Sequence, residues 1–362
     1  MQTKAVRRFG ILTSGGDAPG LNAAIRAVAR TAIDVYGMEA IGFEYGYRGL
    51  VEGRARQLSA RDLSGILTLG GTFLGTSREK PFKDKNWQEG DGAPSAVESI
   101  KRNYKKFGLE CLVVLGGNGT HSTAALLSDE GLNVIGVPKT IDNDIVKTDM
   151  TFGFHTALDV ATDGIDRLHS TASSHNRVMV IEVMGHKAGW LALYAGVAGG
   201  GDVVLIPEIP YDINSVLKTL ENRAASGKTF SIIVVAEGAL SVEEAKLDKK
   251  TFKQQRREMT TSMGYRIAGE IGQATGLEVR VTVLGYLQRG GTPVAYDRIL
   301  ASQFGTAAAH MLARGEYGKM VALQNDTLVG VPLAEIAKQV KQVPLDHRML
   351  TTARGLGICM GD

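Results

Sequence analysis

The 362-residue sequence contains only two cysteines, Cys111 and Cys359, which lie far apart and form no CxxC pair. This scarcity argues against a disulfide framework or a thiolate metal site, and it fits a reducing compartment. No run approaches the roughly 18 apolar residues that a membrane-spanning helix needs. The first residues also lack the apolar segment and cleavage site of a signal peptide. We therefore expect a cytoplasmic protein that has no membrane partner.

The sequence has 41 Lys and Arg residues and 38 Asp and Glu residues, so neither sign of charge is in large excess. The basic residues are scattered, so no nucleic-acid partner is expected. Hydrophobic residues make up 44% of the chain, which is enough for a full core, and the length suggests two domains. The sequence has no internal repeat, and no Pro- or Ser-rich linker marks a boundary. Two interleaved lobes are therefore expected.

Seven short apolar runs predict the strands of an α/β fold. They are Phe9–Leu12, Leu112–Leu115, Val134–Val137, Val178–Val183, Val203–Ile206, Ile232–Val235 and Val281–Leu284. Because these runs show no polar alternation, the strands should be buried on both faces of mainly parallel sheets. Helical patterns alternate with the runs, as three-layer lobes of this kind require.

Two helices have clear apolar stripes. The first follows Asp17, a possible cap, and Pro19, and its stripe comprises Leu21, Ala24, Ile25, Val28, Ala29 and Ala32. The second has Leu158, Ala161, Ile165 and Leu168 on one face. The polar stretch 242–260 is expected to form a solvated surface helix and loop that carries no chemistry.

Three glycine clusters are expected to follow strands: Gly15-Gly16, the segment Gly116-Gly117-Asn118-Gly119-Thr120, and Gly199–Gly201. Beyond the carboxyl ends of parallel strands, glycines let backbone N–H groups approach phosphates at helix N-termini. The first two clusters have the required order of strand, turn and helix. Neither is a Walker loop or a full GxGxxG, so a nicotinamide-dependent oxidoreductase on the same type of sheet is the weaker hypothesis.

The segment Pro138-Lys139-Thr140-Ile141-Asp142-Asn143-Asp144 directly follows a predicted strand. Phosphoryl transfer to a hydroxyl needs a carboxylate for the alcohol proton, cations around the transferred group and oxygen ligands for Mg²⁺. This heptad could supply all three. The structural alternative is an Asx-turn in which the two aspartates cap backbone groups.

Five blocks together resemble the 6-phosphofructokinase family, phosphofructokinase A type. They are Ile-Leu-Thr-Ser-Gly-Gly-Asp-Ala-Pro-Gly-Leu-Asn-Ala, Gly-Gly-Thr-Phe-Leu-Gly-Thr-Ser-Arg, Pro-Lys-Thr-Ile-Asp-Asn-Asp-Ile, Val-Ile-Glu-Val-Met-Gly-His and Gly-Tyr-Leu-Gln-Arg-Gly-Gly-Thr-Pro. They occur in the family's order from residue 9 to about residue 300. The resemblance implies a donor lobe of residues 1–153 plus about 288–338, and a sugar-phosphate lobe of residues 154–287 plus about 339–362.

The resemblance also implies roles in catalysis and donor binding. Asp142 would be the base that takes the proton of the sugar's 1-hydroxyl, with Thr140 beside it, and Arg78 would offer charge to the transferring group. Asp144 is the fourth residue of this catalytic set. The residues implied to bind the donor are Gly15, Arg78, Glu79, Gly117, Asn118, Gly119, Thr120 and Lys139. The implied metal ion is Mg²⁺, held by Asn118 and Asp144. Asn118 replaces an aspartate of most relatives, so weaker Mg²⁺ affinity is expected.

The acceptor implied by the resemblance is fructose 6-phosphate. Its implied site consists of Thr140, Asp142, Arg177, Met184, Gly185, His186, Glu237, Arg280, Tyr286 and Arg289. The three arginines of this site, Arg177, Arg280 and Arg289, would bind the 6-phosphate. In the family the residues at the places of Arg177 and Arg280 come from a neighbouring subunit, so a homodimer or homotetramer is expected. Tyr286 stands where many relatives carry histidine, which removes a titratable group.

The donor is ATP or pyrophosphate. In this family pyrophosphate users typically carry aspartate at the place of Gly119 and lysine at the place of Lys139, whereas nucleotide users carry glycine at both. This chain mixes the two patterns and resembles a mixed-substrate branch. Gly119 leaves room for a nucleotide, so we expect ATP, with pyrophosphate-dependent transfer as the alternative. A catalytically silent sugar-phosphate sensor would be expected to lose Asp142 or the arginines, and the sequence retains them.

Overall fold

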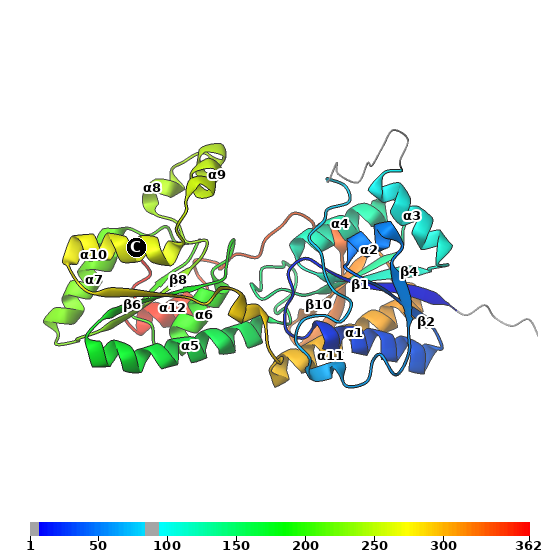
Figure 1. Cartoon of the computed structure of the whole chain (residues 1–362), viewed down its shortest axis with the longest axis horizontal. Helices are drawn as coiled ribbons and strands as arrows, with labels where there is room; N and C mark the ends of the chain where they lie inside the picture. Colours follow the sequence, from blue (N-terminus) through cyan, green and yellow to red (C-terminus); the bar gives the residue numbers. More distant parts are fainter. Residues whose placement is uncertain (1–6, 84–93) are drawn as a thin grey trace, which may run out of the picture. The chain divides into compact units, whose positions relative to one another are not determined.

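The computed structural model describes residues 7–83 and 94–362 (Figure 1). These residues form two compact units. Unit 1 contains the described residues up to Ile141, together with Ile145–Thr156 and Arg289–Val340. Unit 2 contains Asp142–Asp144, Ala157–Gln288 and Lys341–Asp362. Within the described ranges, no helix is both long and apolar enough to cross a membrane.

Unit 1 is built on a seven-stranded sheet. Its strands are β1 (Arg8–Ser14), β2 (Glu39–Phe43), β3 (Ala55–Leu58), β4 (Cys111–Gly116), β5 (Val134–Pro138), β10 (Lys319–Gln324) and β11 (Thr327–Pro332). Their order is β11-β10-β5-β4-β1-β2-β3. The five inner strands are parallel, and the edge strands β3 and β11 are antiparallel to their neighbours.

Helices cover both faces of this sheet (Figure 1). One face carries α1 (Leu21–Arg30) with its π-helical extension η1 (Thr31–Val35), and α11 (Ala295–Arg314). The other face carries α2 (Tyr47–Glu52), α3 (Ala96–Lys106) and α4 (Asn118–Asp129). Two short 3₁₀ turns, η2 (Ile66–Thr68) and η5 (Leu333–Glu335), complete the unit.

The apolar stripe predicted for the first helix is confirmed, since all six of its residues are fully buried. The predicted cap is wrong. The helix begins at Leu21, and its N-cap is Gly20, which has φ 98° and forms no side-chain capping bond. A left-handed backbone favours glycine, and a side chain at Gly20 would also lie 2.9 Å from the ring of Phe152. Asp17 lies too early in the chain to cap this helix.

Unit 2 is built on a four-stranded parallel sheet. Its strands are β6 (Val178–Val183), β7 (Val203–Leu205), β8 (Ser231–Ala236) and β9 (Val279–Val283), in the order β7-β8-β6-β9. Its helices are α5 (Phe154–His175), α6 (Trp190–Ala198), α7 (Ile213–Ala225), α8 (Val242–Ala245), α9 (Lys249–Glu258), α10 (Met263–Thr275) and α12 (Arg348–Gly355). A 3₁₀ turn, η4 (Gly285–Arg289), follows β9. Helices α7 and α10 bury their apolar residues against one face of the sheet.

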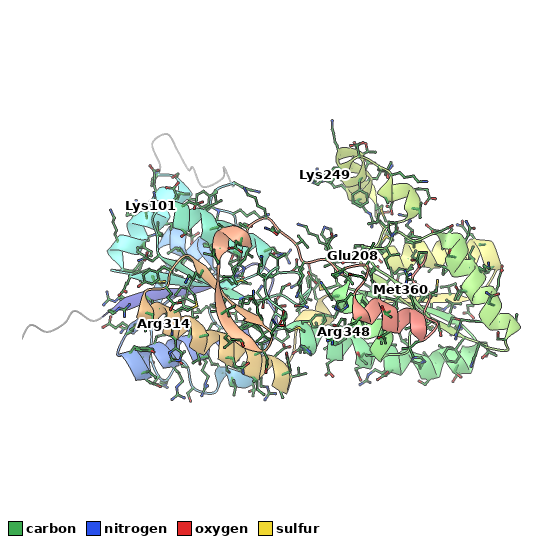
Figure 2. All side chains as sticks on the ribbon, turned by 180° about the vertical axis from the view of Figure 1, so that it is seen from behind. Lys101, Glu208, Lys249, Arg314, Arg348 and Met360 are labelled. Atoms are coloured by element: carbon green, nitrogen blue, oxygen red, sulfur yellow. The ribbon has the colours of Figure 1, made fainter. Side chains whose placement is uncertain are left out.

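All seven predicted strands are present, so the α/β fold with mainly parallel sheets is confirmed. Two details of the prediction are wrong. Strand β9 is half-buried to exposed, because it lies at the edge of its sheet. The cluster Gly199–Gly201 follows helix α6 instead of a strand. The polar stretch 242–260 does form surface helices, and α9, which begins at Lys249 (Figure 2), has no buried residue.

Candidate active site

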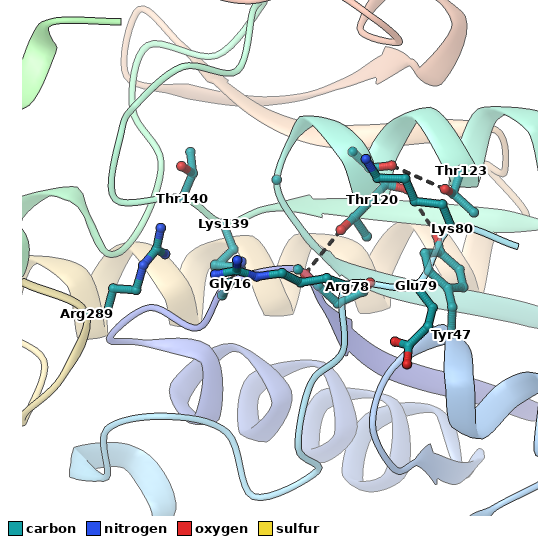
Figure 3. A pocket seen from close by; sticks show the side chains of 14 residues that line it. Gly16, Tyr47, Arg78, Glu79, Lys80, Thr120, Thr123, Lys139, Thr140 and Arg289 are labelled. Carbon is teal, nitrogen blue, oxygen red and sulfur yellow. Dashed lines mark hydrogen bonds between the residues drawn. The ribbon is translucent and has the colours of Figure 1, made fainter. Parts of the chain in front are cut away.

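A pocket of about 280 Å³ lies in unit 1 at the carboxyl ends of β1, β4 and β5 (Figure 3). The strands meet there because their register aligns Ser14 with Gly116, and Gly116 with Pro138. The lining residues are Ser14, Gly15, Gly16, Tyr47, Arg78, Glu79, Lys80, Gly117, Gly119, Thr120, Thr123, Lys139, Thr140 and Arg289. Every residue predicted to bind the donor therefore lines the pocket except Asn118, which lies between two lining residues as the first residue of α4.

The first turn of α4 forms one wall of the pocket. The N-cap is Gly117, the first turn holds no acidic side chain, and no side chain caps the helix. The first N–H groups of a helix have no intrahelical acceptor and carry partial positive charge, so this turn suits an anion. A Cβ atom at Gly119 would meet nothing within 4 Å. Any side chain at that position would therefore extend into open space beside the pocket.

Two hydrogen bonds fix Thr120 in this turn. Its hydroxyl donates to the Ser14 carbonyl oxygen at 3.1 Å, and the buried Tyr47 hydroxyl donates to the Thr120 carbonyl oxygen at 3.0 Å. Close packing requires the glycine at the end of β4, because a Cβ atom at Gly116 would lie 2.3 Å from the Thr120 hydroxyl oxygen. The local sequence thus holds the helix start directly against the end of β1.

The loop that carries Arg78 is attached to the end of β1. The Gly15 N–H donates to the Ser77 carbonyl oxygen at 2.8 Å, and the Thr76 hydroxyl donates to the Gly15 carbonyl oxygen at 2.7 Å. Gly15 has φ 87°, a conformation that favours glycine. These bonds bring Arg78 and Glu79 to the pocket, although they lie more than 60 residues from β1 in the chain.

Four cationic side chains line the pocket, against a single carboxylate, Glu79. The cations are Arg78, Lys80, Lys139 and Arg289 (Figure 3). Lys139 is only 3% exposed, and its ammonium group donates to the Gly16 carbonyl oxygen. This excess of positive charge, together with the helix N-terminus, fits a polyphosphate.

Arg289 is held close to the first glycine pair. Its guanidinium donates to the Asp17 carbonyl oxygen at 3.0 Å, and a Cβ atom at Gly16 would lie 2.7 Å from the guanidinium. The structure therefore places this predicted sugar-phosphate residue in the same pocket as Lys139 and Thr140.

His121 supports the α4 turn from behind. Its side chain is fully buried, and its Nδ1 lies 3.0 Å from the Gly117 carbonyl oxygen. Burial lowers the pKa of His121 to about 4. The ring is therefore neutral near pH 7, and Nδ1–H is the donor in this contact.

In unit 2 the segment Met184–His186 and Glu237 lie at the carboxyl ends of the neighbouring strands β6 and β8. The Glu237 N–H donates to the Val183 carbonyl oxygen at 2.9 Å, and the Gly238 N–H donates to the Gly185 carbonyl oxygen at 3.3 Å. A side chain at Gly238 would lie 2.2 Å from the His186 carbonyl oxygen, so the two loops pack backbone to backbone. Four predicted sugar-binding residues are thereby brought together.

Arg177 and Arg280 lie at the opposite end of the same sheet. Arg177 directly precedes β6, Arg280 lies near the start of β9, and both form ion pairs with Glu278. The hydrogen bond from Arg177 holds the pKa of Glu278 below its usual value. A six-residue strand is about 17 Å long, so these arginines do not join Glu237 and His186 in one site of this chain. Tyr286, on the turn after β9, is 73% exposed.

The aspartates of the heptad belong to unit 2. Asn143, between Asp142 and Asp144, is 3% exposed and has φ 49°. Lys341 contacts this segment twice: its ammonium group donates to the Asn143 side-chain oxygen at 3.1 Å, and its N–H donates to the Asp144 carbonyl oxygen at 2.8 Å.

The sequence analysis did not assign five of the pocket residues: Ser14, Gly16, Tyr47, Lys80 and Thr123. Ser14 and Gly16 stand inside the first motif, and Lys80 follows Arg78 by two positions. Their closeness in sequence to assigned residues could have identified these three as pocket residues. Tyr47 follows a strand that the sequence analysis did not predict. In the part of the chain that the structure describes, no three His, Cys, Asp or Glu residues cluster as a metal site.

Known proteins resemble this chain over most or all of its length. The family model described as Phosphofructokinase matches residues 8–312. The "ATP-dependent 6-phosphofructokinase" of Spirochaeta thermophila is 62% identical over all of both chains, and the protein of that name from Propionibacterium freudenreichii is 50% identical over 98% of this chain and 99% of its own. A crystal structure of Pichia pastoris phosphofructokinase in the T-state matches 98% of this chain with a TM-score of 0.80 and 30% identity, and the match spans 37% of that longer chain. The chain belongs to the phosphofructokinase family.

Proposed function

We propose that this chain is an ATP-dependent 6-phosphofructokinase, which transfers the terminal phosphoryl group of ATP to the 1-hydroxyl of fructose 6-phosphate. The observation that carries this proposal is the unit 1 pocket, where the α4 N-terminus and four cations meet beside an open position at Gly119. Relatives of 50% and 62% identity that bear this name over their full length support it.

The pocket geometry favours ATP as the donor. Gly119 leaves free space at the first turn of α4, and a carboxylate there would repel the phosphates of a nucleotide. Lys139 supplies a buried cation that either donor can use. The chain thus combines the glycine of nucleotide users with the lysine of pyrophosphate users, as in the mixed-substrate branch of the family.

Asp142 acts as the base in this mechanism. It accepts the proton of the 1-hydroxyl while Arg78, Lys139 and the first-turn N–H groups of α4 stabilise the charge on the transferring group. Thr140 lines the pocket two residues before Asp142, so the chain leads directly from the donor pocket to the base. Positioning matters more here than a raised pKa, because the proton leaves late in a loose transition state.

Unit 2 supplies the remaining contacts to the sugar. Glu237 accepts hydrogen bonds from its hydroxyls, and Met184, Gly185 and His186 form the loop against it. Arg289 binds the 6-phosphate together with Arg177 and Arg280. By the resemblance to the family, these last two would serve the site of a neighbouring subunit, and their place at the opposite end of the sheet from Glu237 supports this role. The active enzyme is therefore a homo-oligomer.

Asn118 and Asp144 are the residues that would hold Mg²⁺, as the resemblance to the family implies. The Asn118 amide and the Asp144 carboxylate offer the hard oxygen ligands that this ion prefers, and Mg²⁺ bound to a nucleotide needs only one or two protein ligands in addition to phosphates and water. When bound, Mg²⁺ neutralises charge on the donor phosphates. An amide brings no charge of its own, so Asn118→Asp should tighten Mg²⁺ binding.

The test is the initial rate of fructose 1,6-bisphosphate formation with ATP or pyrophosphate as sole donor. We expect turnover with ATP, and a loss of kcat on the order of a thousandfold in Asp142→Asn, whose KM for ATP should stay within a few fold because the donor pocket is intact. If pyrophosphate is the better donor for the wild type, Lys139 decides the preference and the donor assignment fails. An active Asp142→Asn variant would contradict the assignment of the base.

A further inference from the structure

A short segment of unit 2, Lys341–Val343, contacts the Asp142–Asp144 segment. We call it the strap. The Lys341 ammonium group donates to the Asn143 side-chain oxygen at 3.1 Å, and the Lys341 N–H donates to the Asp144 carbonyl oxygen at 2.8 Å. Asn143 is buried in the left-handed region, at φ 49°. Lys341 therefore contacts this segment through its side chain at Asn143 and through its main chain at Asp144.

The same strap also contacts the segment that follows the sugar loop. The Trp190 indole N–H donates to the Lys341 carbonyl oxygen at 2.8 Å, and the Lys341 ammonium group lies 5.4 Å from the Trp190 ring centroid. The Gln342 side-chain amide lies 3.5 Å from the Lys187 carbonyl oxygen. Lys187 directly follows the predicted sugar loop Met184–His186 in the chain.

Glu208 (Figure 2) completes the connection. One carboxylate oxygen accepts the Val343 N–H at 2.9 Å, and the same carboxylate accepts the Gly189 N–H at 2.9 and 3.0 Å. A Cβ atom at Gly189 would lie 2.4 Å from Ile206, so this position has no room for a side chain. The half-buried Glu208 carboxylate therefore bonds both the strap and the segment that follows the sugar loop.

We propose that Lys341 is a positioning residue, which holds Asn143 so that Asp142 keeps its orientation relative to the sugar loop. The inference rests on the proposed function of Asp142 and of Met184–His186. Lys341 makes four of these contacts: its ammonium group donates to the Asn143 amide oxygen and lies over the Trp190 ring, its N–H donates to the Asp144 carbonyl oxygen, and its carbonyl oxygen accepts the Trp190 indole N–H. A displacement of about 1 Å at a reacting group can cost on the order of a hundredfold in rate, so a bond that fixes this loop bears directly on kcat.

The test compares Lys341→Met, Lys341→Arg and the control Lys218→Met. Methionine keeps an unbranched stem against Trp190 but removes the bond to Asn143. Lys218 is exposed on α7 in the same unit, so its substitution removes a lysine without touching the strap. We expect kcat to fall about tenfold in Lys341→Met, with the KM for ATP within twofold of wild type. Lys341→Arg should recover most of the loss, and Lys218→Met should match wild type.

A double-mutant cycle separates positioning from general loosening. Asn143→Gly keeps the left-handed backbone and removes the amide. If Lys341 acts through Asn143, adding Lys341→Met to Asn143→Gly should lower kcat less than twofold further. Fully multiplicative losses, or a Lys341→Met enzyme with wild-type kcat and only a lower melting temperature, would overturn the proposal.

Amide hydrogen exchange tests the same inference without relying on activity. In Lys341→Met, the amides of residues 142–144 should exchange at least tenfold faster, whereas those of residues 118–120 should not change. Equal exchange at 142–144 in wild type and variant would overturn the inference. A wild-type enzyme that is inactive on fructose 6-phosphate with either donor would overturn the proposed function instead, and the exchange result would still decide the role of Lys341.

Discussion

The substitution Gly119→Asp tests the donor pocket most directly. Gly119 lines the pocket at the first turn of α4, and a Cβ atom there meets nothing within 4 Å. The new carboxylate would therefore extend into the space beside the donor phosphates. Two unit charges about 4 Å apart repel by about 4 kcal/mol at the effective dielectric constant of about 20 that suits partly exposed sites. That repulsion corresponds to a loss in kcat/KM for ATP on the order of a thousandfold.

The variant should fold as well as the wild type. The first turn of α4 holds no acidic residue, and an aspartate near a helix N-terminus is favourable by about 0.3 to 1 kcal/mol. Replacing glycine within a helix removes a further penalty of up to about 1 kcal/mol. The melting temperature should therefore stay the same or rise, so a loss of ATP use would not reflect unfolding.

The assay is the steady-state rate at saturating fructose 6-phosphate with varied ATP, for wild type, Gly119→Asp and Gly119→Asn. Asparagine has the volume of aspartate without its charge, so it measures the steric part alone. We expect Gly119→Asn to lose about tenfold and Gly119→Asp to lose about a thousandfold more than Gly119→Asn. Equal losses would refute the electrostatic reasoning, and an unchanged kcat/KM in both variants would refute the placement of ATP phosphates at this turn.

Three further substitutions test the same pocket. Folding lowers the pKa of His121 from the ordinary histidine value of 6.5 to about 4. Between pH 6.5 and pH 4, His121 is therefore protonated in the unfolded chain and neutral in the folded chain. The free energy of unfolding should drop by about 3 kcal/mol as the pH falls over that range. His121→Asn, which keeps a hydrogen-bond donor, should make this drop smaller. Equal pH dependence of the free energy of unfolding in the two proteins would contradict the low pKa of His121. Lys139→Met should lower kcat/KM on the order of a hundredfold for ATP and for pyrophosphate, measured by steady-state kinetics. A change in kcat/KM below twofold would contradict a role of Lys139 in donor binding. Gly16→Ala forces the Arg289 guanidinium to move, because the new methyl group would lie 2.7 Å from it; the KM for fructose 6-phosphate should rise about tenfold, whereas a rise in the KM for ATP alone would assign Arg289 to the donor.

Among the strands of the described residues, the sequence predicted β1 and β4 to β9 and missed β2, β3, β10 and β11. Strands β4 and β6 are buried along their whole length and almost entirely apolar, with Glu182 in β6 as the one charged residue, and that pattern has few alternative explanations. The hairpin of β10 and β11 was missed, although Asn325 and Asp326 form a two-residue turn with φ 48° and 63° between its strands. That pair is a recognised hairpin signal. Strand β3 has two exposed residues out of four, so its pattern alone could not identify it.

The residues of the proposed donor site could be named from the sequence because glycine clusters and the heptad stand directly after apolar strands. The arrangement of their side chains could not. Tyr47 reaches the Thr120 carbonyl oxygen across 73 positions of the chain, and Lys341 reaches Asn143 across 198. No local pattern marks either contact.

The sequence by itself determined the α/β class, the strands that end at the site and the types of residue that gather there. These properties follow from periodicity, from glycine's backbone freedom and from the chemistry of each side chain, all of which are local. Only the tertiary structure decided that Arg289 lies in the pocket with Lys139, and that Arg177 and Arg280 lie at the far end of the sheet from Glu237. Strand order, register and the path of the strap depend on packing between distant segments, and that packing is a property of the whole folded chain.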